Sequence, residues 1–254
     1  MSIVQVEIKD GIGAIRLAGP RGNAMSEALV ADLSSALRTV GGEPSVRAVL
    51  LASAHPKLFC PGLDLVSLSG IGRAEMGAYM LNFSSLLTDL FALKKPVVAA
   101  VNGAAVAGGC LLALTADWRV AKRGASLGLN EVKVGVPLPW SAVMLLRTAA
   151  PASALNAVAL LGRNFEGDGA VAAGLAHEVA DADAFDGVVT ERLAEFAEKD
   201  AYAFGVTKGY LRGAAVASMR DRETGLLDEF LDGWFSEGTQ ARIHKAVAAL
   251  QAKG

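Results

Sequence analysis

The sequence predicts an α/β fold, and three features of its pattern lead to this prediction. Residues 48–52 (AVLLA) and 97–101 (VVAAV) are short apolar runs between turn residues, as in strands that are buried on both faces. Segments of ten or more residues with helically spaced apolar side chains alternate with these runs, as in a sheet built from strand–turn–helix units. With 254 residues, of which 52% are hydrophobic, the chain can bury a large core as one main domain.

The N-terminal elements follow from turn and capping residues. Residues 4–8 and 12–17 flank an Asp-Gly dipeptide, which supplies the positive φ angles of a tight hairpin, so the chain should open with two antiparallel strands. Ser26 follows a turn-rich segment and can cap a helix that should stop at Gly41 and Gly42. The expected buried face of this helix consists of Leu29, Val30, Leu33, Leu37 and Val40.

The second half of the chain has a mainly helical pattern. From about Ser153 onward, residues 154–161, 185–196 and 226–235 each carry an apolar face. We expect residues 1–166 to form the core with the functional site. Residues 167–254 should form a helical layer that packs on this core or on a neighbouring subunit. We expect residues 167–174 to form the loop between the two halves, and the two halves together should be one continuous domain.

Charge and hydropathy argue against two classes of partner. Lys and Arg number 24 against 26 Asp and Glu, giving a formal net charge of -2, so the chain lacks the basic excess of a protein that neutralises many phosphates. Nucleic acid is therefore not an expected partner. The apolar runs are short or interrupted, below the roughly 20 residues that a membrane helix needs, so no membrane span is expected.

The cysteines and histidines show no spacing typical of a metal site or a disulfide. Cys60 and Cys110 lie in glycine-containing loops and are expected to be free thiols, as suits a reducing compartment. His55, His177 and His244 are far apart in the sequence, so no bound metal is expected. The N-terminus shows no basic segment followed by an apolar core, and we therefore predict a cytoplasmic location.

Three loops carry the residues suited to chemistry. In FCPGLDL (residues 59–65), a Pro-Gly turn leaves the following backbone N–H groups free to bind an oxyanion. In VNGAAVAGGCLLAL (residues 101–114), Ala-Gly-Gly opens an apolar helix whose first N–H groups are unpaired. In LGLNEVKVGVPLPW (residues 127–140), Glu131 stands among apolar residues, where a carboxyl group can have the raised pKa of a general base.

Each of these features has an ordinary structural explanation when it is taken alone. Glycines after strands usually serve turns and close packing, and an isolated glutamate is usually a solvated surface charge. A serine hydrolase is weakly supported, because no G-x-S-x-G segment is present. The combination of the three loops is more specific than any one of them.

FCPGLDL, then KKPVVAAVNGAAVAGGCLLAL, then LNEVKVGVPLPW, in this order and spacing, closely resemble the crotonase (enoyl-CoA hydratase/isomerase) superfamily. The resemblance extends over the N-terminal hairpin, the RGNAMS turn and the helical half, and so covers essentially the whole chain. It implies a crotonase-type ββα spiral core with a C-terminal helical layer, assembled as a homotrimer or a dimer of trimers. It also implies an acyl-CoA thioester as substrate, with coenzyme A as part of the substrate and no separate cofactor.

The resemblance also implies a set of site residues. Glu131 would be the catalytic acid/base, and the backbone N–H groups of Leu63 and Gly108 would hold the thioester oxygen in an oxyanion hole. The RGNAM turn and the segment from Cys60 to Asp64 resemble the loops with which this family cradles coenzyme A. The substrate-binding residues implied in this way are Asn23, Ala24, Met25, Cys60, Pro61, Gly62, Leu63, Asp64, Gly108, Leu111 and Asn130.

One position departs from the pattern of the family's hydratases. These enzymes carry a second glutamate three residues after the oxyanion-hole glycine, and here that position is Leu111. Leucine can neither hold a water nor move a proton, whereas double-bond migration needs only one base. The loop around Glu131 and the C-terminal segment FSEGTQARIHKAVAALQAKG are similar to the mitochondrial-type Δ3,Δ2-enoyl-CoA isomerases. We therefore predict an isomerase that converts 3-enoyl-CoA to 2-trans-enoyl-CoA in fatty acid β-oxidation.

Two alternatives remain at this point. The first is another reaction of the superfamily, including weak enoyl-CoA hydration, because members with similar loops run different chemistries. The second is a non-catalytic relative that binds CoA or RNA, against which the near-neutral charge argues. The sequence also leaves open whether Met76, Met80 and Phe83 contact an acyl tail or only the core, since helical spacing fits both.

Overall fold

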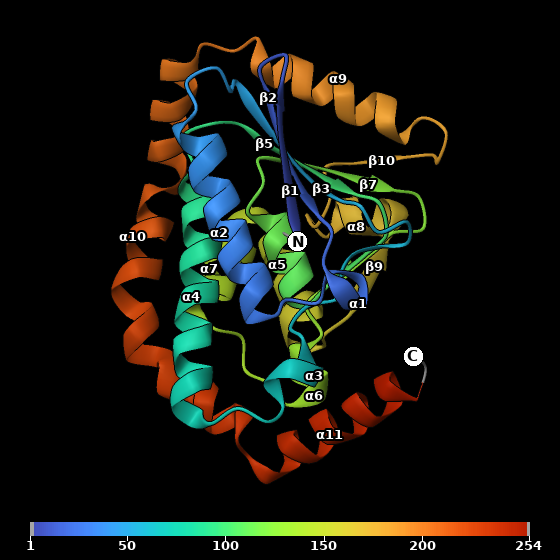
Figure 1. Cartoon of the computed structure of the whole chain (residues 1–254), viewed down its shortest axis with the longest axis vertical. Helices are drawn as coiled ribbons and strands as arrows, with labels where there is room; N and C mark the ends of the chain where they lie inside the picture. The colour runs from blue at the N-terminus through green and yellow to red at the C-terminus, as the bar shows by residue number, and fades with distance from the viewer. Residues whose placement is uncertain (1–2, 253–254) are drawn as a thin grey trace.

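The computed structural model describes residues 3–252 and has an α/β architecture, as predicted, with helices packed around two β-sheets (Figure 1). The first two and last two residues of the chain, including the end of the C-terminal segment quoted above, lie outside the described residues. The strands are β1 (Val4–Lys9), β2 (Ile12–Leu17), β3 (Ala48–Ser53), β4 (Leu58–Cys60), β5 (Val97–Val101), β6 (Ala104–Val106), β7 (Trp118–Lys122), β8 (Ser126–Gly128), β9 (Asn164–Glu166) and β10 (Glu178–Ala180). The helices are α1 (Pro20–Asn23), α2 (Glu27–Gly42), α3 (Leu65–Leu68), α4 (Arg73–Ala92), α5 (Gly108–Leu114), α6 (Glu131–Val134), α7 (Trp140–Ala149), α8 (Gly167–Ala172), α9 (Phe185–Ala197), α10 (Ala201–Trp234) and α11 (Glu237–Gln251), with a 3₁₀ turn at Ala152–Ala154 and a π-helical turn at Asn156–Leu160.

The chain alternates between the two sheets. The larger sheet has the order β1-β2-β3-β5-β7-β10 and the smaller one β4-β6-β8-β9. Strands β3, β5 and β7 of the larger sheet are each followed directly by a strand of the smaller sheet and then by a helix. This repetition is the ββα spiral that the family resemblance implied. It brings the loops after β4, β6 and β8 to neighbouring positions because these three strands pair in parallel.

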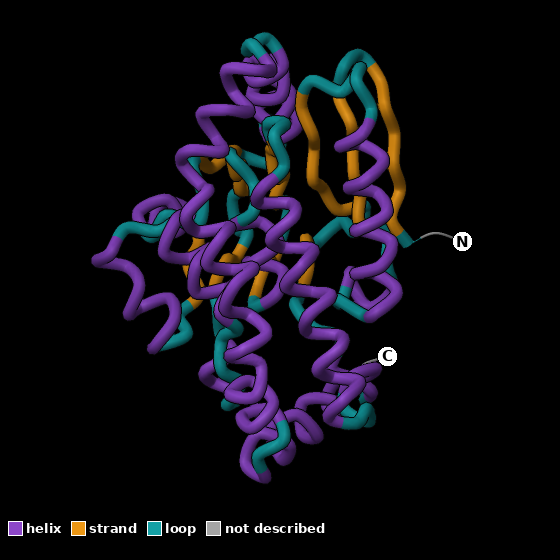
Figure 2. Tube along the Cα trace, turned by 90° about the vertical axis from the view of Figure 1, so that its left-hand side faces the viewer, coloured by secondary structure: helices purple, strands orange, loops and turns teal. Residues whose placement is uncertain are grey.

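The central strands β3 and β5 of the larger sheet are buried on both faces, which explains their apolar sequences. In β5, all five residues are buried. Figure 1 shows α9 across one face of this sheet, where Phe185, Val189 and Leu193 pack on the strands. Figure 2 shows the helices that cover the opposite side. The predicted buried strands at residues 48–52 and 97–101 are therefore confirmed.

The N-terminal predictions are also confirmed. Asp10 and Gly11 both have positive φ, 50° and 78°, in the hairpin between β1 and β2. The Ser26 hydroxyl accepts a hydrogen bond from the Leu29 N–H at 3.3 Å and caps α2. The expected buried face of this helix is buried, and the helix includes both Gly41 and Gly42 before it ends.

The second half differs from the sequence prediction in three places. Residues 167–174 were expected to be a loop, but α8 occupies most of this range because Ala170 and Ala173 are buried against the core. Residues 154–161 form 3₁₀ and π-helical turns in place of a regular amphipathic helix, and Leu160 and Leu161 are exposed. Strand β10 lies within residues 167–254, which were expected to form a helical layer, and β9 interrupts the mainly helical pattern expected from about Ser153 onward.

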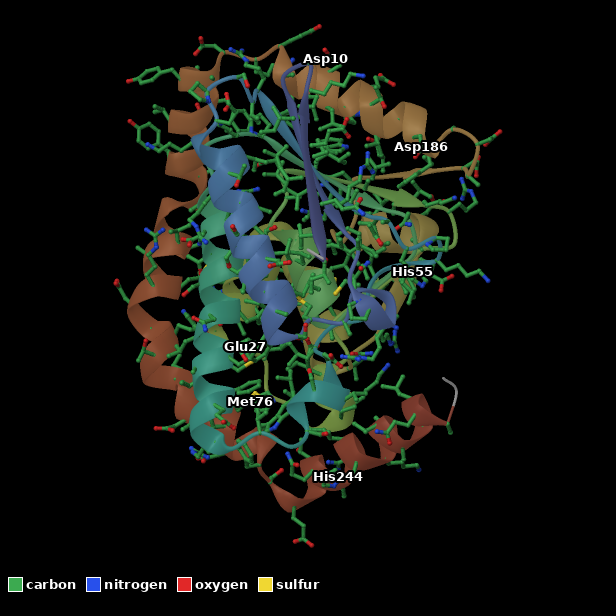
Figure 3. All side chains as sticks on the ribbon, in the orientation of Figure 1. Asp10, Glu27, His55, Met76, Asp186 and His244 are labelled. Carbon is green, nitrogen blue, oxygen red and sulfur yellow. The ribbon has the colours of Figure 1, made fainter. Side chains whose placement is uncertain are left out.

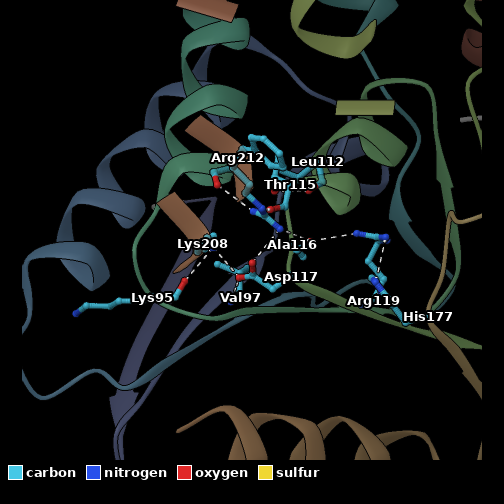
Figure 4. A network of polar contacts seen from close by, with 11 residues as sticks. Lys95, Val97, Leu112, Thr115, Ala116, Asp117, Arg119, His177, Lys208 and Arg212 are labelled. Atoms are coloured by element: carbon cyan, nitrogen blue, oxygen red, sulfur yellow. Dashed lines mark hydrogen bonds and ion pairs between the residues drawn. The ribbon is translucent and has the colours of Figure 1, made fainter. Parts of the chain in front are cut away.

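Helix α10 packs along α4 and α7 of its own chain, and Figure 1 shows it beside α4. A cluster of buried charges anchors its N-terminal part to the core (Figure 4). The Asp117 carboxylate accepts a hydrogen bond from Lys208 Nζ at 2.6 Å and pairs with Arg212 Nη2 at 2.8 Å, and it also accepts one from the Val97 N–H at 2.8 Å. Arg212 additionally donates to the Phe91 carbonyl at 2.9 Å. The helical layer is thus joined to the strand β5 by directional contacts as well as by apolar packing.

Between residues 3 and 252, the helices are too short or too polar for any of them to cross a lipid bilayer.

Candidate active site

A cavity of about 200 Å³ lies where the three loops singled out in the sequence come together. Six of the predicted site residues line it: Pro61, Leu63, Gly108, Leu111, Asn130 and Glu131. The other lining residues are Leu65, Met80, Phe83, Ala107, Val134, Val136, Pro137, Pro139, Phe230 and Trp234. Since nearly all of these side chains are apolar, the cavity offers few competing partners to a charged group inside it.

Glu131 is the only ionisable side chain among the described residues that line this cavity. It is the first residue of α6, and its Oε2 is shielded from solvent with no hydrogen-bond partner in the described part of the chain. Burial disfavours the charged carboxylate and raises the pKa of Glu131 from 4.5 to about 7. A carboxyl group with this pKa can both accept and donate a proton near neutral pH.

The Leu63 N–H is directed away from the neighbouring chain segment. Met25 donates its N–H to the Gly62 carbonyl at 2.8 Å and accepts from the Asp64 N–H at 3.3 Å. In such a parallel bridge, the residue between the two bonded positions turns its own N–H to the opposite edge. Within residues 3–252, the Leu63 N–H has no partner, which leaves it free as a donor.

The Gly108 N–H belongs to the first turn of α5, so it has no partner within the helix. The preceding residue, Ala107, has φ 50° and ψ −128°, a backbone conformation that L-residues rarely adopt and that costs on the order of 1–3 kcal/mol. The fold thus maintains a strained turn at the residue that directs the Gly108 N–H. Strain of this kind concentrates at functional sites.

The two donor-bearing loops are in direct contact. Gly62 has φ 97°, and a Cβ added there would lie 2.9 Å from the Ala107 Cβ and 3.2 Å from the Gly108 nitrogen. A Cβ on Gly109 would lie only 2.0 Å from the Cys60 carbonyl oxygen. The glycines of the PGLD and AGGC motifs are therefore required by the close approach of the two backbones, which fixes the Leu63 and Gly108 N–H groups relative to each other.

The remaining predicted binding residues do not line the cavity. Asn23, Met25, Cys60 and Asp64 are almost fully buried, Ala24 and Gly62 are buried beside them, and the polar side chains of this group make structural contacts. Asn23 Nδ2 donates to Ser53 Oγ at 2.7 Å and to the Phe59 carbonyl at 3.0 Å. Asp64 forms an ion pair with Arg21. These side chains thus stabilise the loops. A contact between the RGNAM turn and coenzyme A would therefore come from the backbone of the turn.

The thiols and imidazoles are poorly placed for chemistry. Both cysteines are free and buried, and burial raises the pKa of each thiol to about 12, which keeps it protonated. Figure 3 shows His55 beside α1 and His244 on α11, in separate parts of the molecule. The stretch from residue 3 to residue 252 contains no cluster of three or more side chains suited to bind a metal.

The sequence did not assign Phe230 and Trp234 to the site. Both belong to the last turns of α10, and their apolar spacing indicated only a packing face. Nothing local distinguishes an aromatic residue that lines a cavity from one that fills a core, and the assignment required the tertiary contact between α10 and the loop after α6. Of the three residues left open on α4, Met80 and Phe83 line the cavity, whereas Met76 is buried in the core.

This arrangement has the parts needed to remove a proton next to a carbonyl group. A buried carboxyl group supplies the base, and two unpaired N–H groups on residues of the same cavity can hold the oxygen on which negative charge develops.

Comparison with known proteins agrees with this geometry. The sequence pattern of the Enoyl-CoA hydratase/isomerase family matches residues 7–230. The chain is 27% identical to the mitochondrial Enoyl-CoA delta isomerase 1 of Mus musculus over 254 residues, covering 99% of this chain and 88% of the relative. It is 33% identical to a putative enoyl-CoA hydratase of Thermus thermophilus, covering 92% of this chain and 98% of the relative.

Among solved structures, the human mitochondrial Δ3,Δ2-enoyl-CoA isomerase superposes with a TM-score of 0.93 at 25% identity, covering 99% of both chains. An enoyl-CoA hydratase of Mycobacterium marinum superposes with a TM-score of 0.83 at 28% identity, covering 90% of this chain and 99% of the other. The crotonase-type fold is therefore confirmed, and so is the resemblance to the mitochondrial-type isomerases. The chain belongs to the enoyl-CoA hydratase/isomerase family.

Proposed function

We propose that this enzyme moves the double bond of a 3-enoyl-CoA to give the 2-trans-enoyl-CoA, as a step of fatty acid β-oxidation. The single observation that supports this reaction most is the presence of one carboxyl group, Glu131, in an otherwise apolar cavity. The position at which the family's hydratases carry their second glutamate is Leu111, which lines the same cavity. With one base and no second carboxylate, proton transfer within the substrate is favoured over the addition of water.

In the proposed mechanism, the thioester oxygen accepts hydrogen bonds from the Leu63 and Gly108 N–H groups. Glu131 removes a proton from C2, and the electron pair of the broken C–H bond is delocalised over the C3–C4 double bond and the thioester oxygen. Donors that are already oriented stabilise this dienolate, and a single donor of this type is typically worth about 10²–10³ in rate. Glu131 then returns the proton to C4, which leaves the double bond between C2 and C3.

The cavity also favours this chemistry by excluding water. The apolar side chains around Glu131 keep the carboxyl group out of bulk solvent, which raises its pKa and makes it a stronger base. They also lower the chance that water protonates or attacks the dienolate. The leucine at position 111 contributes to both effects because it fills the place where a second carboxylate would hold a water.

The experiment that tests this proposal compares the purified enzyme with its Glu131→Gln variant on a 3-enoyl-CoA. Glutamine keeps the shape of the side chain but cannot accept the C2 proton, so formation of the conjugated 2-trans thioester should fall by about 10²–10⁴. Binding of a saturated acyl-CoA should change little. The matched control is Glu27→Gln, which alters an exposed carboxylate on α2 (Figure 3) and should leave the rate unchanged. Near-normal turnover by Glu131→Gln would remove Glu131 from the mechanism.

A second candidate function is hydration of 2-enoyl-CoA, which the hydratase names among the relatives favour. The cytoplasmic location stays a prediction, as relatives named as mitochondrial are among the matches. Assembly as a trimer or a dimer of trimers likewise stays a prediction, which sedimentation equilibrium of the purified protein would test.

A further inference from the structure

A second cavity adjoins the one that contains Glu131. It also has a volume of about 200 Å³ and is lined by Pro137, Leu138, Pro139, Trp140, Val143, Glu223, Leu226, Leu227, Glu229 and Phe230. Three of these residues, Pro137, Pro139 and Phe230, line the Glu131 cavity as well. Residues that line both cavities form the wall between them, and Phe230 is the only one of the three with a large side chain.

The wall is held rigidly. Phe230 is 3% exposed, and its ring stacks on that of Trp234 with 6.0 Å between centroids and 23° between planes. Trp234 is itself 1% exposed, so the two rings are packed together in the interior. Helix α10 is pressed against the loop that carries the prolines, because a Cβ on Gly233 would lie 2.4 Å from Pro137 Cδ. The Phe230 ring is therefore a fixed partition.

The two cavities differ in their relation to Glu131. The first contains the carboxyl group and the residues that carry the two N–H donors, so the reacting carbons of a bound acyl chain must lie there. The second cavity contains neither Glu131 nor the two donor residues. Apart from Glu223 and Glu229, its lining is largely apolar, which suits the end of an alkyl chain. An acyl chain that starts at Glu131 would reach the second cavity only past Phe230.

We propose that Phe230 limits the length of the acyl chain that this enzyme accepts. This inference rests on the proposed function, because it takes an acyl-CoA as the ligand of the Glu131 cavity. An acyl chain that extends from Glu131 can lengthen inside the first cavity, whose volume is about 200 Å³, only until it meets the Phe230 ring. The first cavity thus limits the length of the chain, and the second cavity is an extension closed by one aromatic ring.

The proposal predicts a break in how affinity depends on chain length. Each methylene group transferred from water to an apolar cavity tightens binding about fourfold. In the wild type, this gain should stop at the chain length that fills the first cavity, within the series from butanoyl- to hexadecanoyl-CoA. In Phe230→Ala, the two cavities join, and the gain should continue over about four further methylene groups, so that the longer thioester would bind on the order of 10²-fold more tightly than it binds to the wild type.

The test measures the dissociation constants of saturated acyl-CoAs, from butanoyl- to hexadecanoyl-CoA, by isothermal titration calorimetry. These ligands need no chemistry, so the result does not depend on which reaction the enzyme performs. Phe230→Leu is included because alanine leaves a large void in the core. With leucine, the gain in affinity should stop at a chain length between those of the wild type and Phe230→Ala, with a smaller loss of packing. The matched control is Phe235→Ala, which removes a partly buried ring at the end of the same helix that lines neither cavity.

The outcomes are distinguishable. A break that shifts to longer chains in Phe230→Ala and Phe230→Leu, but not in Phe235→Ala, supports the proposal. Affinity that rises steadily to hexadecanoyl-CoA in the wild type overturns the partition while leaving the proposed function intact. The same profile in all three variants and the wild type also overturns it. If the wild type binds no acyl-CoA of any length, the proposed function fails together with the partition.

Discussion

Leu111 and Glu131 line the same cavity from two different helices, and only one of them can ionise. Leu111 lies in the short helix α5 that begins with the Gly108 donor, is 1% exposed, and packs in the main hydrophobic core. Glu131 begins α6 and has an unpartnered Oε2 within the described residues. The pairing of one carboxyl group with one leucine is the structural basis for the proposal that this site transfers a proton within the substrate and does not add water.

Replacing Leu111 with glutamate should shift the reaction toward hydration. The new carboxylate would stand one helical turn from Gly108 in the same cavity as Glu131, where the two groups can hold a water between them. Because two carboxylates in an apolar cavity repel, the pKa of one should rise further and keep it protonated near neutrality. Formation of 3-hydroxyacyl-CoA should become detectable by chromatography, and isomerisation should fall.

The matched control for this variant is Leu111→Gln. Glutamine is about as large as glutamate and is also polar, but it cannot move a proton. Both variants should lose stability, because each buries a polar group where leucine packed. Only the glutamate variant should hydrate. Equal hydration by the glutamine variant would mean that water is positioned, but not activated, at residue 111.

Removing the Gly108 N–H should be far more damaging than adding a methyl group to the same residue. Gly108→Pro deletes the donor and should lower turnover by about 10²–10³ from the lost hydrogen bond alone. Gly108→Ala keeps the N–H, and its Cβ would lie 3.3 Å from Phe83 Cζ, a contact that a small side-chain movement can relieve. Steady-state rates of both variants test the donor.

Cys110→Ser provides the control for the neighbouring thiol. Since burial keeps Cys110 protonated, its loss should affect turnover much less than Gly108→Pro does. A folded Cys110→Ser protein without activity would point to a thiol mechanism instead.

The pKa of Glu131 predicts opposite effects of pH on activity and on stability. Since the ionised carboxylate is the base, kcat/KM should increase with pH up to about 7 and then level off. The folded state holds a proton on Glu131 that the unfolded state releases above pH 4.5. The free energy of unfolding should therefore decrease between about pH 4.5 and 7, by on the order of 3 kcal/mol.

Urea unfolding at several pH values measures this contribution. Glu131→Gln lacks the titrating group, so its unfolding free energy should lose this part of the pH dependence and exceed that of the wild type above pH 7. If wild type and variant show parallel pH profiles, the pKa of Glu131 is not raised in the folded protein.

Asp117→Asn should destabilise the fold without changing the chemistry of the site. The substitution leaves the buried Lys208 and Arg212 cations facing a neutral amide, and breaking a buried ion pair in this way typically costs about 3–5 kcal/mol. Asp228→Asn removes an exposed partner of Arg73 and should cost less than about 1 kcal/mol. Thermal unfolding of the two variants compares them, and similar losses would contradict the anchoring role of the cluster around Asp117.

The parts of the fold that the sequence predicted are those with local signals. The hairpin at Asp10 and Gly11 follows from backbone angles that few residues tolerate, and α2 follows from the Ser26 cap. The short strands of the smaller sheet were not predicted, because three residues are too few to show alternation. Residues 167–174 look like a loop in the sequence because of three glycines, yet the burial of Ala170 makes α8 stable.

The candidate site likewise has residues that local sequence signals indicated and residues that they did not. Glu131, Gly108 and Leu63 could be found because the motifs that contain them are contiguous in the sequence. Phe230 and Trp234 could not, since they reach the cavity from a helix about 100 residues farther along the chain, and only tertiary packing brings them there. Substrate binding by Asn23, Met25 and Asp64 stays a prediction, and the structure adds that their hydrogen bonds help to hold the Leu63 backbone in place.

The most direct test of the one-carboxylate account is the ratio of two rates measured on the unmutated enzyme. Equal amounts of protein are given a 3-enoyl-CoA and a 2-trans-enoyl-CoA of the same chain length, and the 2-trans and 3-hydroxy products are separated by chromatography. Because a missing acid/base group typically costs about 10²–10⁴ in rate, isomerisation should exceed hydration by at least about 10². An enzyme that hydrates faster than it isomerises would contradict the account and identify the protein as a hydratase despite Leu111.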